Sequence, residues 1–228
     1  MLMRVLSLAL PLAAVVSLGP IASAQPVDAG APGPYGRGGV HTGYGGGGTG
    51  LIVAPSVSAG VRLPSGLELG GYVTSVGYGD LATVLAFGPE IRLERALGGA
   101  TTLDLRASGG VGLYDGEAGY RNATGLAAAL EAGVTRRFSL GRGVDLAATG
   151  GAYASATRLS GSAVPTSQLG ASAGVLVGLQ LEFDALGGRV GVGPSGGRSL
   201  LDPGRVGALG TVPYLGALRD RGLVTFSF

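Results

Sequence analysis

The side chains with the clearest chemical potential in this chain are arginines and carboxylates at alternate positions. Glu90, Arg92 and Glu94 alternate in one segment, and Asp104 and Arg106 alternate in the next. Paired carboxylates can serve as a general acid and a general base. Carboxylates that alternate with arginines favour ion pairs instead, because each buried charge needs a partner. We therefore expect salt bridges at these positions and no acid–base catalysis.

A histidine base is the other route to catalysis. The chain has a single histidine, His41, in the glycine-rich segment 39–47, and no Ser or Asp partner can be assigned to it from the sequence. The run GYGGGG at 43–48 is followed by neither Lys-Ser/Thr nor a helix, so it is not a phosphate-binding loop. No metal-ligand spacing occurs in the sequence. We expect no enzymatic activity, no metal and no cofactor, and a hydrolase centred on His41 is the remaining enzymatic alternative.

Composition narrows the class of protein. The 228 residues include 47 glycines and no cysteine, and only 13% of them are charged. The 16 basic residues are all arginines, and the net charge of +2 arises from interspersed signs. The absence of a basic patch argues against a nucleic-acid partner. The absence of cysteine excludes a disulfide framework.

The N-terminal segment has the three-part layout of a secretory signal peptide. Arg4 precedes an apolar run that ends near Leu18, Gly19-Pro20 follows, and Ala22-Ser23-Ala24 forms a cleavage box. We expect residues 1–24 to be removed by cleavage after Ala24. A permanent membrane anchor is the alternative.

The mature chain divides into a leader and one domain. Residues 25–38 are rich in Pro and Gly and are expected to be disordered. Residues 39–228 are expected to fold as a single domain. They hold no apolar run near the ~18–20 residues that a spanning helix needs. A closed barrel is the other structure that crosses a bilayer with every backbone group paired.

Apolar and polar residues alternate along most of this domain, which is typical of strands and not of helices. Copies of a Leu-Gly turn, a strand and a Ser/Thr-Gly-Gly recur at 96–110, 139–151 and 185–197, with a looser copy at 65–75. Tight connections alternate with longer ones, as they do in outer-membrane barrels. The sequence therefore predicts an all-β fold: an antiparallel, transmembrane, up-and-down barrel of ten strands, or of eight if one hairpin is misread. The expected strands are 39–47, 51–63, 67–78, 83–94, 101–114, 124–138, 143–157, 168–183, 189–197 and 218–228, of which the first and ninth are weak.

The alternation assigns one face of each strand to lipid and the other to the lumen. The charges predicted to face the lumen gather near the tight turns: Arg62, Glu68, Glu90, Arg92, Glu94, Asp104, Arg106, Glu131, Arg137, Asp145 and Glu182. We call these residues the lumen polar cluster and expect an ion-pair network that fills the periplasmic half. The inward positions further up are small or neutral, with Tyr114 and Tyr153 among them, so we expect a roomier outer half.

The last eight residues, RGLVTFSF, alternate up to a terminal aromatic residue. With the ten expected strands, they make the chain resemble a small bacterial outer-membrane β-barrel. In that class Val224, Phe226 and Phe228 match the signal read by the barrel-assembly machinery. Phe138 and Phe183 fall at the same membrane edge as Phe228 and form an expected aromatic girdle. The resemblance implies insertion in the outer membrane with its lipid as partner, and we expect a monomer.

Three functions compete on this sequence. The leading one is a structural or surface-exposed barrel whose polar lumen is mostly plugged. The second is a small-solute channel or a lipid-binding barrel, and the third is the His41 hydrolase. A secreted soluble β-sandwich is the least favoured alternative. In it, the residues assigned here to the lipid face would form the core, and the charged face would be exposed to solvent. Nothing in the sequence identifies a substrate.

Overall fold

The computed structural model describes residues 32–45, 50–78, 82–116, 123–161, 164–185, 188–201 and 224–227. The described part is built from strands and contains no helix long and apolar enough to cross a membrane. The strands are β1 (Gly33–Gly45), β2 (Gly50–Arg62), β3 (Leu67–Tyr78), β4 (Ala82–Gly98), β5 (Thr101–Gly116), β6 (Ala123–Gly141), β7 (Val144–Gly161), β8 (Val164–Ala185), β9 (Gly188–Val192), β10 (Ser195–Leu201) and β11 (Val224–Ser227).

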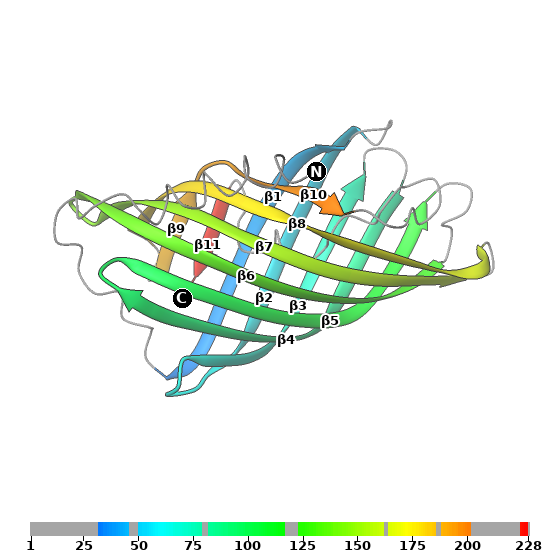
Figure 1. Ribbon diagram of the computed structural model, residues 1–228, viewed down its shortest axis with the longest axis horizontal. Helices are drawn as coiled ribbons and strands as arrows, with labels where there is room; N and C mark the ends of the chain where they lie inside the picture. The colour runs from blue at the N-terminus through cyan, green and yellow to red at the C-terminus, as the bar shows by residue number, and fades with distance from the viewer. Residues whose placement is uncertain are drawn as a thin grey trace.

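The strands form one closed antiparallel sheet (Figure 1). Each strand from β1 to β8 pairs with the next along the chain. β11 pairs with β1 on one side and with β9 on the other, and β9 pairs with β8, so the sheet meets itself. Where the described residues of β11 pair on both sides, the seam presents no open edge of unpaired backbone groups.

β9 and β10 are two parts of one strand. Leu181 lies opposite Val192, and Gly178, three residues earlier, lies opposite Ser195, three residues later, so the register with β8 continues across Gly193 and Pro194. The Leu179 backbone N–H donates to the Pro194 carbonyl at 2.9 Å. The barrel therefore has ten strands, which confirms the predicted count and excludes the eight-strand alternative.

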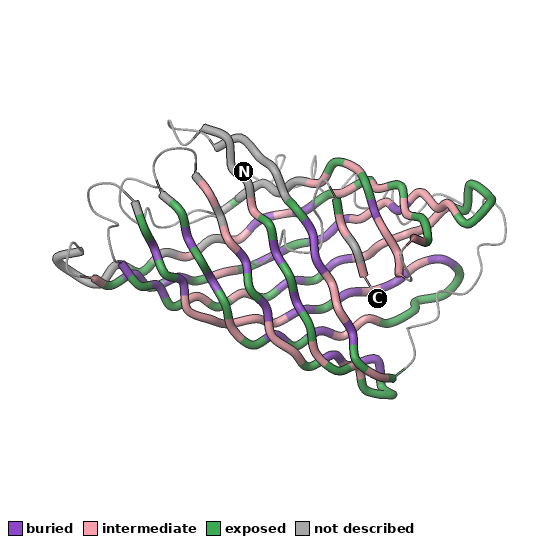
Figure 2. Tube along the Cα trace, turned by 180° about the vertical axis from the view of Figure 1, so that it is seen from behind, coloured by how far each residue is buried: buried purple, intermediate pink, exposed green. Residues whose placement is uncertain are grey.

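The barrel reverses the polarity of a water-soluble protein. Figure 2 shows buried and exposed positions alternating along the strands, as the two-residue period of a strand requires. The exposed positions are rich in Leu, Val and Ile, and the buried positions include glutamates, arginines and aspartate. Apolar side chains therefore cover the outer wall, while charged and polar ones lie in the lumen.

Tight turns join the strands at one end of the barrel, which we call the tight-turn end. The β2–β3 turn is closed by a hydrogen bond from the Gly66 N–H to the Leu63 carbonyl at 2.9 Å. Pro64 is the second residue of this turn, where the φ that its ring imposes matches the φ that the turn requires. Gly66 has φ of 80°, and the β4–β5 turn uses Gly99 at 55°. These left-handed values explain glycine at both turns. In the β6–β7 turn Arg142 itself adopts φ of 53°.

Several strands extend beyond their expected bounds. β1 begins at Gly33, so residues 33–38, expected in the disordered leader, are instead paired with β2. Pro34 has no N–H to donate, but it falls at the start of the strand, where this loss is tolerated. The expected boundary at residue 39 was wrong for this reason. The predicted signal peptide, residues 1–24, lies outside the described residues.

Candidate functional site

The strands place every member of the lumen polar cluster on the inner side of the barrel. Inward and outward residues alternate, so charges two residues apart, such as Glu90 and Arg92, share the lumen face. Glu68 is completely buried, with a relative exposure of 0%. The other buried members are Glu90, Arg92, Asp104, Arg106 and Glu131, and the half-buried members are Arg62, Glu94, Arg137, Asp145 and Glu182.

Glu68 on β3 is held between two arginines, one from the adjacent strand β2 and one from β1, the next strand beyond it. Arg62 on β2 donates to Glu68 Oε1 from both Nε, at 2.8 Å, and Nη2, at 2.5 Å. Arg37 on β1 donates from Nη2 to the same oxygen at 2.8 Å. Two guanidinium groups thus neutralise one buried carboxylate, which offsets its desolvation.

Arg37 also connects this group to β4 and β5. Its Nη2 lies 3.2 Å from Glu94 Oε2. Arg92 Nη2 lies 3.8 Å from the same Glu94 oxygen, and Arg92 makes a two-pronged contact with Asp104, with Nε 2.8 Å from Oδ1 and Nη2 2.5 Å from Oδ2. Paired parallel bonds of this kind are among the stronger hydrogen bonds in proteins. The ion pairs therefore run continuously from β1 to β5.

Two further groups complete the network. Arg106 on β5 lies between Glu90, at 3.6 Å, and Glu131, at 3.4 Å. Further along the sheet, Glu182 on β8 accepts from Arg137 Nε at 2.7 Å and from Arg189 Nε at 3.0 Å.

Arg189 gathers three carboxylates around one guanidinium. Besides Glu182 it contacts Asp145 on β7, and it lies 3.5 Å from Asp184. The network therefore also includes strands β6 to β9. Within the described residues each charge of the lumen polar cluster takes part in at least one ion pair.

Sequence reasoning missed two arginines of the network, Arg37 and Arg189. Arg37 fell in the segment assigned to a leader, and Arg189 fell in a strand that was weak on its own. The alternation was nonetheless present. Arg37 is two residues from the buried Tyr35 and shares its inward face, and Arg189 is three residues from the outward Val192 and lies on the opposite, inward face. Extending the two-residue period backward from residue 39 would have found Arg37.

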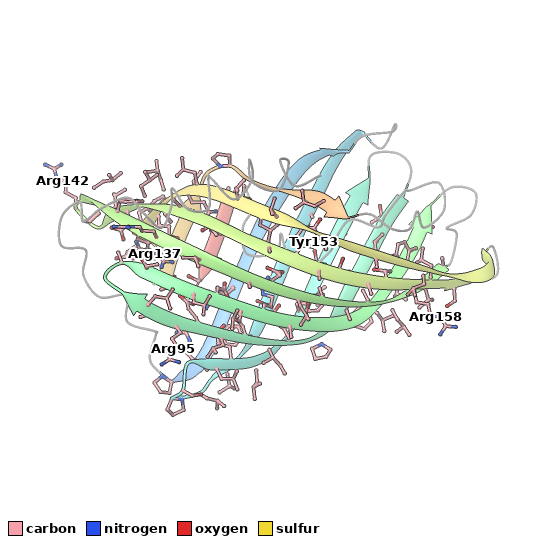
Figure 3. All side chains as sticks on the ribbon, in the orientation of Figure 1. Arg95, Arg137, Arg142, Tyr153 and Arg158 are labelled. Atoms are coloured by element: carbon pink, nitrogen blue, oxygen red, sulfur yellow. The ribbon has the colours of Figure 1, made fainter. Side chains whose placement is uncertain are left out.

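A small polar cavity of about 100 Å³ lies within this half of the lumen. Its lining includes Arg37, Arg92, Arg137 and Arg189, together with Asp104 and Glu182. Figure 3 shows Arg137 at this end of the barrel, and its side chain pairs with Glu182 beside the cavity. A water molecule occupies about 30 Å³ in the liquid, so the cavity has room for a few waters between the ion pairs.

Large side chains occupy part of the lumen away from the tight turns. Tyr72, Tyr114 and Tyr153 are buried, and so are Leu159 and Leu176, with exposures of 1% and 2%. Tyr153 and Leu176 pack together against Ala129, and Figure 3 shows Tyr153 midway along the barrel. In this region tyrosine side chains extend over the small residues of other strands and occupy part of the half that was expected to be roomier.

Glycine makes this tyrosine packing possible. A Cβ at Gly110 would lie 2.7 Å from the Tyr72 hydroxyl, and a Cβ at Gly125 would lie 2.9 Å from the Tyr114 ring. Both distances are shorter than a normal contact, so a larger residue at either position would displace the ring. At these two described positions the small inward residues accommodate aromatic side chains.

The remaining predicted residues lie at the tight-turn end or beyond the described part. Phe138 and Phe183 both face outward, and the guanidinium of Arg136 stacks 5.4 Å from the Phe138 ring centre. Val224 is exposed on β11. The backbone of Phe226 belongs to β11, and the backbone of His41, on β1, pairs with Ala54 of β2. The side chains of Phe226 and His41 lie outside the described residues, and so does the whole of Phe228.

The chemistry available to the site is ionic. Among the described residues no group of three or more His, Asp or Glu side chains could hold a metal ion. The arginines and carboxylates of the lumen neutralise one another and cross-link neighbouring strands. Comparisons with family models, with curated proteins and with solved structures find no match to this chain.

Proposed function

We propose that the protein is an integral barrel of the bacterial outer membrane, with a structural or surface role and a lumen that ion pairs keep closed. One observation carries the proposal: the closed sheet exposes its leucines, valines and isoleucines and buries its arginines and carboxylates. In water this arrangement would cost free energy on both faces, whereas in a bilayer the lipid solvates the apolar wall.

The height of the apolar wall supports a membrane location. On β4 the outward positions between Thr83 and Arg95 are all apolar, and these two residues are twelve positions apart. At ~3.3 Å per residue and a tilt of ~40°, this stretch rises about 30 Å along the barrel axis. Transmembrane barrels carry an apolar band about 25 Å tall. The outward charges Arg95 and Arg136 lie at its tight-turn edge.

The export signal and the last strand support the outer membrane in particular. We propose that residues 1–24 direct export and that Val224, Phe226 and Phe228 are read by the barrel-assembly machinery. The tight-turn end then faces the periplasm, as short turns do in such barrels. We propose a monomer with lipid as its surroundings and no catalytic role, because the lumen charges are engaged with one another.

The proposal is tested by refolding the mature chain into vesicles and measuring flotation, heat-modifiable migration on a gel, and ion conductance across a planar bilayer. We expect a floating, heat-modifiable barrel that conducts no steady current. A chain that stays in the aqueous fraction would contradict the membrane location. Steady ohmic steps would contradict the closed lumen and favour the small-solute channel, for which the polar cavity near Arg137 would be part of the path.

A further inference from the structure

We propose that the outer wall formed by β4, β5, β6 and β7 binds a phospholipid with an anionic headgroup. Its phosphate would lie at the arginines of the tight-turn end, and an acyl chain would lie in a groove on the same strands. The inference rests on the membrane location proposed above. It adds a defined lipid site on one wall of the barrel.

The groove crosses the middle of these four strands on their outward side. It encloses about 590 Å³ and is almost entirely apolar. Its lining includes Ala107, Gly109, Ala128 and Ala154, together with the larger Ile91 and Leu130. Small side chains lower the surface between larger ones, which leaves a depression that a flexible hydrocarbon chain can fill.

The charges of the same wall are placed for a phosphate. Arg95 on β4 and Arg136 on β6 both occupy outward positions near the tight-turn end, and Arg142 lies in the β6–β7 turn. Figure 3 shows Arg95 and Arg142 at this end and Arg158 at the other. In the described part of these strands, the one carboxylate at an outward position is Asp115, which lies near the far end of β5. The tight-turn edge of this wall is therefore cationic.

The distance between arginines and groove fits one lipid leaflet. Ile91 and Arg95 are four residues apart, and Leu130 and Arg136 are six apart. Along a strand these steps span ~13 Å and ~20 Å, which a tilt of ~40° reduces to about 10–15 Å of depth. The hydrocarbon core is about 30 Å thick, so each leaflet is about 15 Å deep. A headgroup at the arginines thus places its chain at the depth of the groove.

Charge also argues for a lipid and against a second copy of the barrel. In a two-fold symmetric dimer the same patch of each copy meets the other. Arg95 and Arg136 of the two copies would then approach one another without outward carboxylates between them. An anionic lipid complements these charges, since a basic residue at a membrane surface attracts anionic headgroups.

The absence of tryptophan from the chain permits a direct test. Leu130→Trp places a single fluorophore in the groove, and Val73→Trp places a matched one at an outward position of β3. Both variants are refolded into phosphatidylcholine vesicles that contain about one tenth phosphatidylglycerol, with bromine, a quencher, on the chains of one lipid or the other. We expect brominated phosphatidylglycerol to quench Leu130→Trp about threefold more than Val73→Trp, because Arg95 and Arg136 attract the anionic headgroup to this wall. Adding Arg95→Gln and Arg136→Gln should abolish the excess, and Arg158→Gln should leave it unchanged.

Each other outcome contradicts a definite part of the proposal. Equal quenching of both reporters by brominated phosphatidylglycerol would overturn the lipid site while leaving the membrane location intact. An excess that survives loss of both arginines would overturn the headgroup assignment. Quenching of Val73→Trp alone, with a dimer mass by native mass spectrometry, would mean that a second copy covers the groove. Quenching of neither reporter by brominated phosphatidylcholine would refute the membrane location itself.

Discussion

At the tight-turn end of the lumen, arginines are shared between carboxylates of different strands. Arg92 contacts both Asp104 and Glu94, and Arg106 lies between Glu90 and Glu131. Removing one partner of a buried pair leaves the other charge without compensation, which typically costs about 3–5 kcal/mol. The network therefore gives single arginines a large influence on stability and on the charge of the lumen.

Arg92→Ala tests most directly how much the lumen ion pairs contribute to stability. It leaves Asp104 and Glu94 buried without one of their cations, so we expect the free energy of unfolding to fall by about 3–5 kcal/mol. Any pore it opens should select cations, because carboxylates then predominate. Denaturation in detergent micelles, followed by circular dichroism, measures the first effect, and planar-bilayer conductance measures the second.

Arg95→Ala is the matched control for Arg92→Ala. Arg95 lies three residues further along β4, on the exposed outward face. We expect its loss to change stability by no more than about 0.5 kcal/mol in detergent, as surface substitutions usually do. Equal effects of the two substitutions would mean that the lumen ion pairs do not hold the barrel together.

At the scale of the strands, paired glycines allow neighbouring backbones to approach closely. A Cβ at Gly60 would lie 2.2 Å from the Leu69 carbonyl oxygen, and a Cβ at Gly88 would lie 2.0 Å from that of Gly109. No side chain fits at such distances, so these positions of β2 and β4 require glycine. Glycines in strands often mark a close backbone approach or a tight bend. Here they shape the wall around the tyrosines.

Gly110→Ala tests this role of glycine. Its Cβ would lie 2.3 Å from the Phe87 carbonyl oxygen as well as close to the Tyr72 hydroxyl, so the backbone must shift. We expect a loss of about 1–3 kcal/mol in the free energy of unfolding, the usual cost of overpacking. The neighbouring Gly109→Ala faces outward, where its Cβ is 3.6 Å from the nearest atom, the Ala127 carbonyl oxygen. The entropic effect of Gly→Ala alone would raise stability, so a similar loss for both variants would contradict a specific close approach at Gly110.

For the whole molecule, closure of the sheet determines which surface the barrel presents. β11 joins β1 to β9 through four pairs on each side, among them Val224 with Val40 and Val224 with Val192. With the seam closed, the outward side chains of neighbouring strands form one continuous wall that is mostly apolar, with charges near its ends. That wall predicts a different response to charge at its middle and at its edge.

Leu130→Arg and Leu140→Arg measure this response. Both leucines lie on β6 with nearly equal exposure, 62% and 60%, but Leu130 is mid-wall and Leu140 adjoins the tight turn. In a bilayer, arginine should cost about 2–4 kcal/mol at the middle and about 0–1 kcal/mol at the edge. We expect the folded fraction in vesicles, measured by heat-modifiable migration, to fall for Leu130→Arg alone. A water-soluble barrel would tolerate both changes equally.

The alternation of residues was sufficient to predict the face of each strand and therefore most of the site. Because side chains alternate strictly along a strand, the period assigned Glu68, Arg106 and Glu182 to the lumen without knowledge of the fold. It failed where composition masked it. The Pro/Gly-rich segment that contains Arg37 looked disordered, although Pro34 falls at the start of β1, where a strand tolerates the loss of a donor.

The sequence by itself therefore determined the class of fold and which face of each strand is polar, because these depend on local periodicity and turn residues. It favoured ten strands over eight, and the pairing of the closed sheet decided between them. Only the tertiary structure decided which charges meet, because ion pairs between β1 and β4 or between β7 and β9 depend on register and closure. The packing of Tyr72 over Gly110 likewise joins β3 to β5 across an intervening strand. Such contacts arise from the curvature of the closed wall, which no single strand encodes.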